Sequence, residues 1–78
     1  AQDLEYGLPM RLCGTSGIPR ARTLGAIRSR ESLVDAGREV GRQSRLVGIQ
    51  LVLAPVVDVA SNPDNPIIGM RSFGSDPY

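Results

Sequence analysis

The sequence contains no histidine, no lysine and no tryptophan, and its single cysteine is Cys13. One cysteine cannot form a disulfide within the chain. Without histidine, the usual Cys/His zinc sites and any Ser-His or Cys-His nucleophile pair are excluded within these residues. The absence of lysine also excludes Schiff-base chemistry on the chain's own side chains. We therefore predict no metal site and no cofactor.

Long apolar runs and clustered charges of one sign are also missing. No run approaches the roughly 20 apolar residues that span a bilayer, so we predict no membrane segment. The first residues, 1–5, are neither basic nor strongly apolar, and we predict that they are not a signal peptide. Nine arginines against eight acidic residues give a formal charge of +1, which does not favour a nucleic-acid-binding protein. A lone cysteine is compatible with a reducing compartment, but the localisation stays open.

The chain has 78 residues, with only three aromatic residues but six prolines and nine glycines. This length allows one small domain at most, since domains usually run to about 100–150 residues. Large side chains that could anchor a core are scarce, and much of the chain is predicted to form loops. The composition therefore favours a piece of a larger structure.

The clearest predicted element is a helix over residues 30–47. Ser29 can cap its N-terminus, Glu31 lies in the first turn, where a carboxylate suits the helix dipole, and Gly48 suits the position after the last turn. Two glycines on the apolar face, Gly37 and Gly41, suggest close approach to a neighbouring backbone. The small and apolar positions recur at helical spacing, at Leu33, Gly37, Val40, Ser44 and Val47.

A strand is predicted over residues 50–54, directly after this helix. Its apolar run does not alternate with polar residues, which is typical of a strand buried on both faces of a parallel sheet. Residues 1–5 are predicted to end a preceding, parallel strand, and residues 21–28 to form a short helix. The predicted fold class is therefore α/β, with about one β-loop-α-β unit and the loop that follows it.

The charged residues that follow the two predicted strands are candidates for a site, because ligands of α/β folds bind beyond the carboxyl ends of strands. Asp3, Glu5 and Arg11 follow the first strand, Asp58 ends the second, and Arg71 lies in the loop beyond it. Asp58 follows a run of apolar residues, so we predict that its carboxylate is partly buried and paired with Arg71. The alternative is that these are solvated loop charges and turn caps.

Two motifs resemble those of glycoside hydrolase family 3, most closely its β-N-acetylglucosaminidase branch. The longer motif covers residues 53–59 (LAPVVDV), Asn62-Pro63 and residues 65–77 (NPIIGMRSFGSDP). The shorter one is Asp3-Leu4-Glu5-Tyr6-Gly7 with Arg11, similar to a D-x-E-x-G turn and its following arginine. Here Tyr6 stands where a second glycine is usual. The resemblance extends over essentially the whole chain.

The resemblance implies a fragment of a (β/α)₈ barrel of the TIM type, a fold that typically needs about 250 residues. Residues 1–78 would be part of the N-terminal barrel domain, from roughly the second strand to the loop after the third. It further implies that Asp3, Arg11 and Arg71 bind sugar hydroxyls in the glycone subsite, with Asp58 in a pocket or structural role. The family's Asp nucleophile and its acid/base lie on later strands and loops, so we assign no catalytic residue here.

We therefore predict a part of a retaining β-N-acetylhexosaminidase that hydrolyses terminal β-linked N-acetylglucosamine. The expected partners are the carbohydrate substrate and the remainder of the barrel, and the fragment alone is expected to be inactive. A β-glucosidase of the same family is the alternative enzyme. A non-catalytic carbohydrate-binding piece and a small stand-alone interaction module are alternatives from other classes.

Overall fold

The structure is a computed structural model that describes residues 1–77. Its main element is the helix α2, Arg30–Leu46, preceded by the short helix α1, Ala21–Gly25. Two 3₁₀ turns complete the regular structure, η1 at Leu8–Met10 and η2 at Gly69–Arg71. No helix in this part of the chain is long and apolar enough to cross a membrane.

The predicted helix over residues 30–47 is confirmed almost to the residue. The hydroxyl of Ser29 accepts a hydrogen bond from the Ser32 backbone N–H at 3.3 Å, which satisfies one of the free donors at the helix start. Gly48 has φ of +80° and ends the helix in the left-handed region. The second predicted helix is present but shorter, because α1 ends at Gly25 rather than at residue 28.

The two predicted strands, over residues 50–54 and in residues 1–5, are both wrong as strands. Among residues 1–77 there is one isolated bridge, between Gln2 and Val52, and it is parallel as expected. The Gln2 backbone donates to the Leu51 carbonyl at 3.0 Å and accepts from the Leu53 N–H at 2.8 Å. A strand is stabilised by ladders on its edges. Within residues 1–5, Gln2 alone makes both hydrogen bonds, so no ladder of repeated bonds forms.

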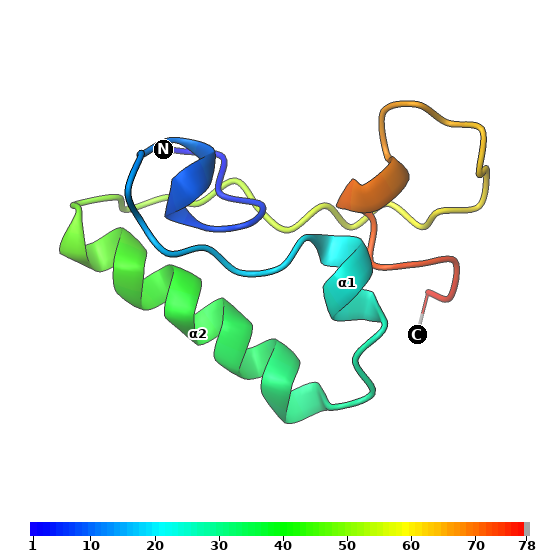
Figure 1. Cartoon of the computed structure of the whole chain (residues 1–78), viewed down its shortest axis with the longest axis horizontal. Coiled ribbons are helices and arrows are strands. Elements are labelled where there is room, and N and C mark those ends of the chain that lie inside the picture. The colour runs from blue at the N-terminus through cyan, green and yellow to red at the C-terminus, as the bar shows by residue number, and fades with distance from the viewer. Residues whose placement is uncertain (78) are drawn as a thin grey trace.

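The segments are arranged along α2, as Figure 1 shows. The N-terminal residues and the extended chain that follows α2 run beside one another above this helix, while α1 packs against η2 at the other end. Four buried apolar side chains form the core between them: Leu4, Leu8, Ala21 and Leu24. The core is small, and it centres on the segment that carries Asp3 and Glu5.

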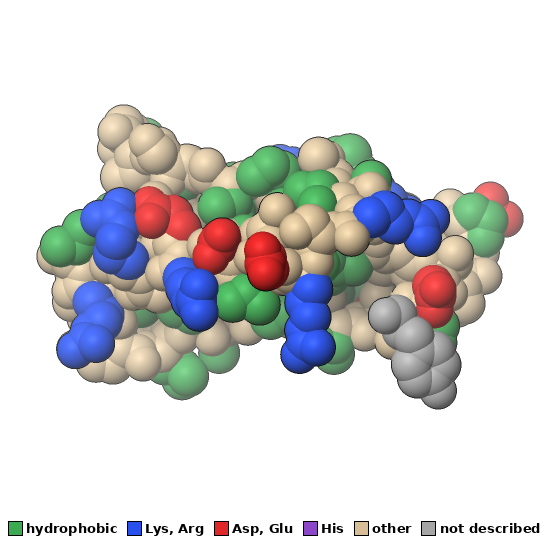
Figure 2. Space-filling model, turned by 90° about the horizontal axis from the view of Figure 1, so that it is seen from below, with side chains coloured by type: hydrophobic (Ala, Val, Ile, Leu, Met, Phe, Trp, Pro, Cys, Tyr) green, Lys and Arg blue, Asp and Glu red, His purple; other side chains and the backbone are tan. Residues whose placement is uncertain are grey.

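The outward face of α2 is charged. Figure 2, seen from the α2 side, shows acidic and basic side chains interspersed along it. Arg38 pairs with Asp35 at 3.1 Å, and Arg42 pairs with Glu39 at 2.6 Å, each three residues apart. The two hydrogen bonds from Arg42 and one from Gln43 lower the pKa of Glu39 from 4.5 to about 2. This face is a solvated helix surface.

The inward face of α2 differs from the sequence prediction. A β-carbon added at Gly37 or Gly41 would meet no atom within 4 Å, so the expected close approach to a neighbouring backbone is wrong at both glycines. They line instead an apolar cavity of about 380 Å³ between α2 and the extended segment, whose wall includes Leu4, Val52 and Pro55. The helix and the extended segment are therefore not sealed against each other.

Candidate functional site

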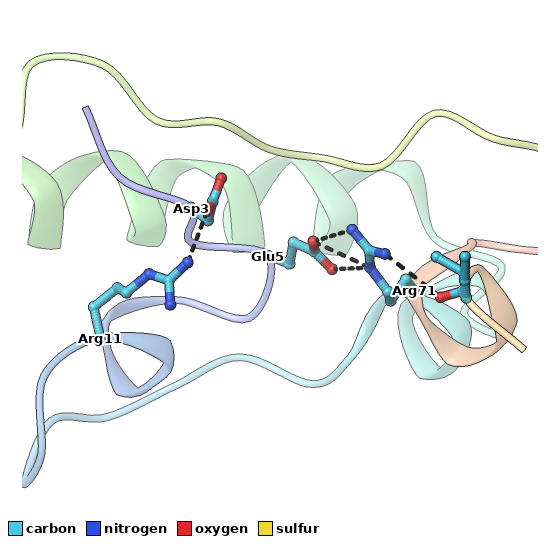
Figure 3. A network of polar contacts seen from close by, with 5 residues as sticks. Asp3, Glu5, Arg11 and Arg71 are labelled. Atoms are coloured by element: carbon cyan, nitrogen blue, oxygen red, sulfur yellow. Dashed lines mark hydrogen bonds and ion pairs between the residues drawn. The ribbon is translucent and has the colours of Figure 1, made fainter.

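Two carboxylates and two arginines meet beside the N-terminal segment. We call this the acid–arginine cluster: Asp3, Glu5, Arg11 and Arg71. Figure 3 shows that Asp3 pairs with Arg11 and Glu5 pairs with Arg71, with the two pairs side by side. The cluster joins the loop after the first segment to the loop that carries η2.

The two carboxylates flank Leu4, where the chain enters a tight turn over residues 4–7. Leu4 is 1% exposed and belongs to the core, so its burial anchors the segment that carries Asp3 and Glu5. The bond pair between Gln2 and residues 51 and 53 holds the start of this segment in place. The buried leucine and this bond pair therefore hold the segment from which both carboxylates extend.

A tight turn brings Arg11 back to Asp3. Gly7 has φ of +88°, a conformation that glycine adopts readily, and its N–H donates to the Leu4 carbonyl at 3.1 Å. The 3₁₀ turn η1 follows, and Arg11 caps its end by donating to the Leu8 carbonyl at 2.9 Å. Arg11 Nη2 then donates to Asp3 Oδ2 at 2.7 Å. Both side chains stay about half exposed, at 43% and 46%.

The second pair is more extensive and spans the chain. Arg71 Nε donates to both oxygens of Glu5, at 3.2 Å to Oε1 and 3.1 Å to Oε2, and Nη2 donates to Oε1 at 2.8 Å. On its other side, Arg71 Nη1 contacts the carbonyl oxygen of Ile67 at 3.5 Å. The Glu5 side chain is 15% exposed, whereas that of Arg71 is 42% exposed. Glu5 therefore holds one edge of the Arg71 guanidinium, while the side chain stays partly exposed to solvent.

The electrostatics of Arg71 show how close the other carboxylates lie. The hydrogen bonds from Arg71 to Glu5 are the largest cause of a raised Arg71 pKa, followed by the charge of Glu5. The charges of Asp58 and Asp3 raise it further, while desolvation opposes the shift. Arg71 therefore remains a cation at any physiological pH, and three carboxylates act on it.

The predictions for Asp58 are corrected by the structure. Its side chain is exposed rather than partly buried, and Arg71 hydrogen-bonds to Glu5 instead. The chain around Asp58 is held through its backbone, since the buried hydroxyl of Ser72 donates to the Asp58 carbonyl at 2.7 Å. The apolar residues before Asp58 suggested burial, but Val57 beside it is 84% exposed because nothing in residues 1–77 covers that side.

Glu5 is the functional candidate to which sequence reasoning gave no role, although it was named among the loop charges. The available signal was its place two residues after Asp3 in the D-x-E-x-G motif. That spacing identifies neither residue's partner. The pairing with Arg71 joins positions 66 apart, and only the fold reveals it.

The chemistry open to this cluster is the binding of a neutral polar ligand. Asp3 uses one carboxylate oxygen for Arg11, and both arginines carry more N–H groups than their ion pairs engage. Accepting and donating groups side by side suit neighbouring hydroxyls, which do both. Among residues 1–77, no group of three His, Cys, Asp or Glu side chains is placed to hold a metal ion.

Comparison with known proteins gives matches over the whole chain. Residues 1–78 match the glycosyl hydrolase family 3 N terminal domain. The chain is 50% identical over 66 residues to a Mycobacterium tuberculosis protein named beta-hexosaminidase LpqI, covering 85% of this chain and 17% of that protein. It is 32% identical over 74 residues to a beta-N-acetylglucosaminidase/beta-glucosidase of Cellulomonas fimi, covering 95% of this chain and 13% of that protein.

A solved structure is similar as well. The structure of M tuberculosis LpqI superposes with a TM-score of 0.75 and 46% identity, covering 96% of this chain and 22% of that chain. The chain thus spans about a sixth of the curated LpqI sequence and about a fifth of the solved one.

Proposed function

Since the chain belongs to the glycosyl hydrolase family 3 N-terminal domain family, we propose that it forms one β-loop-α-β portion of a (β/α)₈ barrel in a retaining glycosidase. The parallel bridge between Gln2 and Val52, with α2 crossing between them, is the connection such a barrel repeats. The remaining barrel strands would extend the pairing that stops here after one bridge.

The proposed substrate is a terminal β-linked N-acetylglucosamine, and the activity is that of a β-N-acetylhexosaminidase. The names of the matched relatives favour this sugar, and one relative is also named a beta-glucosidase, so a β-glucoside is the alternative substrate. Nucleophile and acid/base would come from other parts of the whole protein. Residues 1–78 would bind the sugar and would have no activity alone.

The observation that carries this proposal is the acid–arginine cluster. In the proposed roles, Asp3, Arg11 and Arg71 bind hydroxyls of the glycone. Asp3 has a free carboxylate oxygen as acceptor, and the half-exposed guanidinium groups supply donors. A single hydrogen bond to a charged group contributes about 1.5–3 kcal/mol. Asp58 is exposed near Arg71 and is proposed to complete the pocket rim.

The test uses the whole protein and chromogenic N-acetyl-β-glucosaminide and β-glucoside substrates. Arg11→Ala and Arg71→Ala should each lower kcat/KM for the preferred substrate about ten- to hundredfold, from the loss of one charged hydrogen bond. Arg38→Ala is the control, because Arg38 is an exposed arginine in an ion pair on the outer face of α2. Kinetics of Arg71→Ala equal to those of Arg38→Ala would contradict the assignment. Turnover by residues 1–78 alone, well above a blank, would contradict the partial-barrel reading.

A further inference from the structure

Glu5 is more buried and makes more hydrogen bonds than Asp3, the other carboxylate of the cluster. Both of its oxygens accept hydrogen bonds from Arg71, and its side chain is only 15% exposed. Asp3 shares one oxygen with Arg11 and is 46% exposed. A sugar can therefore reach Asp3, whereas Glu5 is largely buried and already accepts from Arg71 at both oxygens.

We propose that Glu5 is a positioning residue, which fixes the guanidinium of Arg71 so that its open N–H groups face the sugar. This inference rests on the proposed function and adds to it a residue that does not itself touch the ligand. Glu5 fixes the Nε and Nη2 edge, and the Ile67 carbonyl lies against Nη1. The N–H groups that remain are the donors available to a ligand.

The need for such a residue follows from the charges around Arg71. Asp3 and Asp58 also attract this guanidinium, as the direction of its pKa shift reflects. A long arginine side chain has many rotamers, and ordering it only when the ligand binds would weaken binding. Without the carboxylate of Glu5, Arg71 is free to turn toward Asp3 or Asp58. Pairing with Asp3 would also occupy an acceptor that the sugar needs.

A double-mutant cycle in the whole protein tests this inference. The four proteins are wild type, Glu5→Gln, Arg71→Ala and the double variant, assayed with 4-nitrophenyl N-acetyl-β-glucosaminide. Glu5→Gln keeps the shape of the side chain but removes the charge and one acceptor. We expect kcat/KM to fall about 10- to 100-fold, as for a misplaced binding group, and we expect no further fall when Glu5→Gln is added to Arg71→Ala.

Glu39→Gln is the matched control, because Glu39 accepts from Arg42 Nε and Nη2 in a similar pair on α2, at 2.8 and 2.6 Å. It should leave kcat and KM unchanged. The inhibition constant of free N-acetylglucosamine should rise in Glu5→Gln in parallel with KM, which a general loss of active protein would not produce. If Glu5→Gln fails to fold, Glu5→Asp replaces it, because aspartate keeps the charge but has a shorter side chain. Glu5→Asp should then lower kcat/KM in the same direction by a smaller factor.

The outcomes separate the two proposals. A wild-type kcat/KM in folded Glu5→Gln, together with a strong loss in Arg71→Ala, would overturn the positioning role alone. Equal losses from Glu5→Gln in the presence and absence of Arg71 would also overturn it, because Glu5 would then act independently. A wild-type kcat/KM in Arg71→Ala would overturn both the positioning role and the proposed sugar site.

Discussion

Gly25 lies directly against the backbone of Phe73, so that a β-carbon on Gly25 would overlap the Phe73 carbonyl group. Gly25 ends α1, and Phe73 follows η2 by two residues, so this contact determines how closely α1 and η2 pack. Arg71 is the last residue of η2. The missing side chain of Gly25 therefore allows the loop that carries Arg71 to approach the core.

Gly25→Ala should destabilise the whole protein. The added methyl group has no space, so α1 or the chain at Phe73 must shift, and such overpacking typically costs about 1–3 kcal/mol. The measurement is the free energy of unfolding in urea. Because the shift would move η2, KM should rise as well. A stability equal to that of wild type would show that the two segments separate without cost.

Gly37→Ala and Gly41→Ala should have the opposite effect. Both glycines lie within α2, and a β-carbon at either would meet no atom within 4 Å. Alanine is favoured over glycine inside a helix by about 1 kcal/mol, so each change should raise the free energy of unfolding by up to that amount. A decrease would mean that a segment outside this chain lies against α2 at these positions.

The stability contributed by Glu39 should depend on pH in the acid range. Its pKa in the folded protein is lowered to about 2, chiefly by hydrogen bonds from Arg42 and then Gln43. A lowered pKa means that the stabilisation is complete above the ordinary value of 4.5 and is lost as the pH falls toward 2. The difference in unfolding temperature between wild type and Glu39→Gln should therefore shrink over that interval.

Arg42→Ala provides the control for this titration. Without the guanidinium, the main cause of the lowered pKa is gone, and the pKa of Glu39 should return toward 4.5. In the Arg42→Ala background, Glu39→Gln should then change the unfolding temperature much less with pH between 4.5 and 2. A difference that persists unchanged would assign the pH dependence to other carboxylates.

Residues 1–78 expressed alone should not unfold cooperatively. Leu51, Leu53 and Val57 are 57%, 52% and 84% exposed, whereas the alternate residues Val52, Ala54 and Val56 are partly buried. Such a row of apolar side chains needs a covering layer, and the chain has one long helix on the other side. Circular dichroism in increasing urea should give a gradual loss of helix. A sharp transition in a monomer would contradict this expectation.

Leu53→Asp tests whether the rest of the whole protein covers the apolar side chains that are exposed in residues 1–78. In the whole protein, a carboxylate at a buried position should strongly lower the unfolding temperature, because a charge without a partner is costly to bury. In residues 1–78 alone, Leu53 is already half exposed, so the same change should have little effect. Similar effects in both proteins would mean that Leu53 stays at the surface.

The sequence was sufficient to predict α2 and the parallel direction of the bridged segments. The helix depends on local signals, the Ser29 cap and the glycine after the last turn, which act within a few residues. The direction of the bridge follows from the helix that joins the two segments. Local signals could not decide whether the strand forms, because its stability depends on neighbouring strands that these residues do not supply.

The partner of Arg71 was also beyond sequence reasoning. Asp58 was expected from its position after an apolar run, but three carboxylates lie within electrostatic reach and Glu5 makes the hydrogen bonds. The choice depends on how the fold brings the turn at Glu5 and the loop that carries η2 together, which no local signal in the sequence gives. The position of the glycine that lies against another backbone was predicted wrongly for a similar reason. Helical spacing drew attention to Gly37 and Gly41, whereas the contact that excludes a side chain is at Gly25.

The two ion pairs of the cluster also differ in when a growing chain can complete them. Arg11 follows Asp3 by eight residues, whereas Arg71 follows Glu5 by 66. The first pair can form as soon as its own turn has been synthesised. The second must wait until α1, α2 and the extended segment have emerged, and it closes a much longer loop. A product terminated before Arg71 would carry both carboxylates with Arg11 as the single arginine of the cluster, and Glu5 would lack its partner.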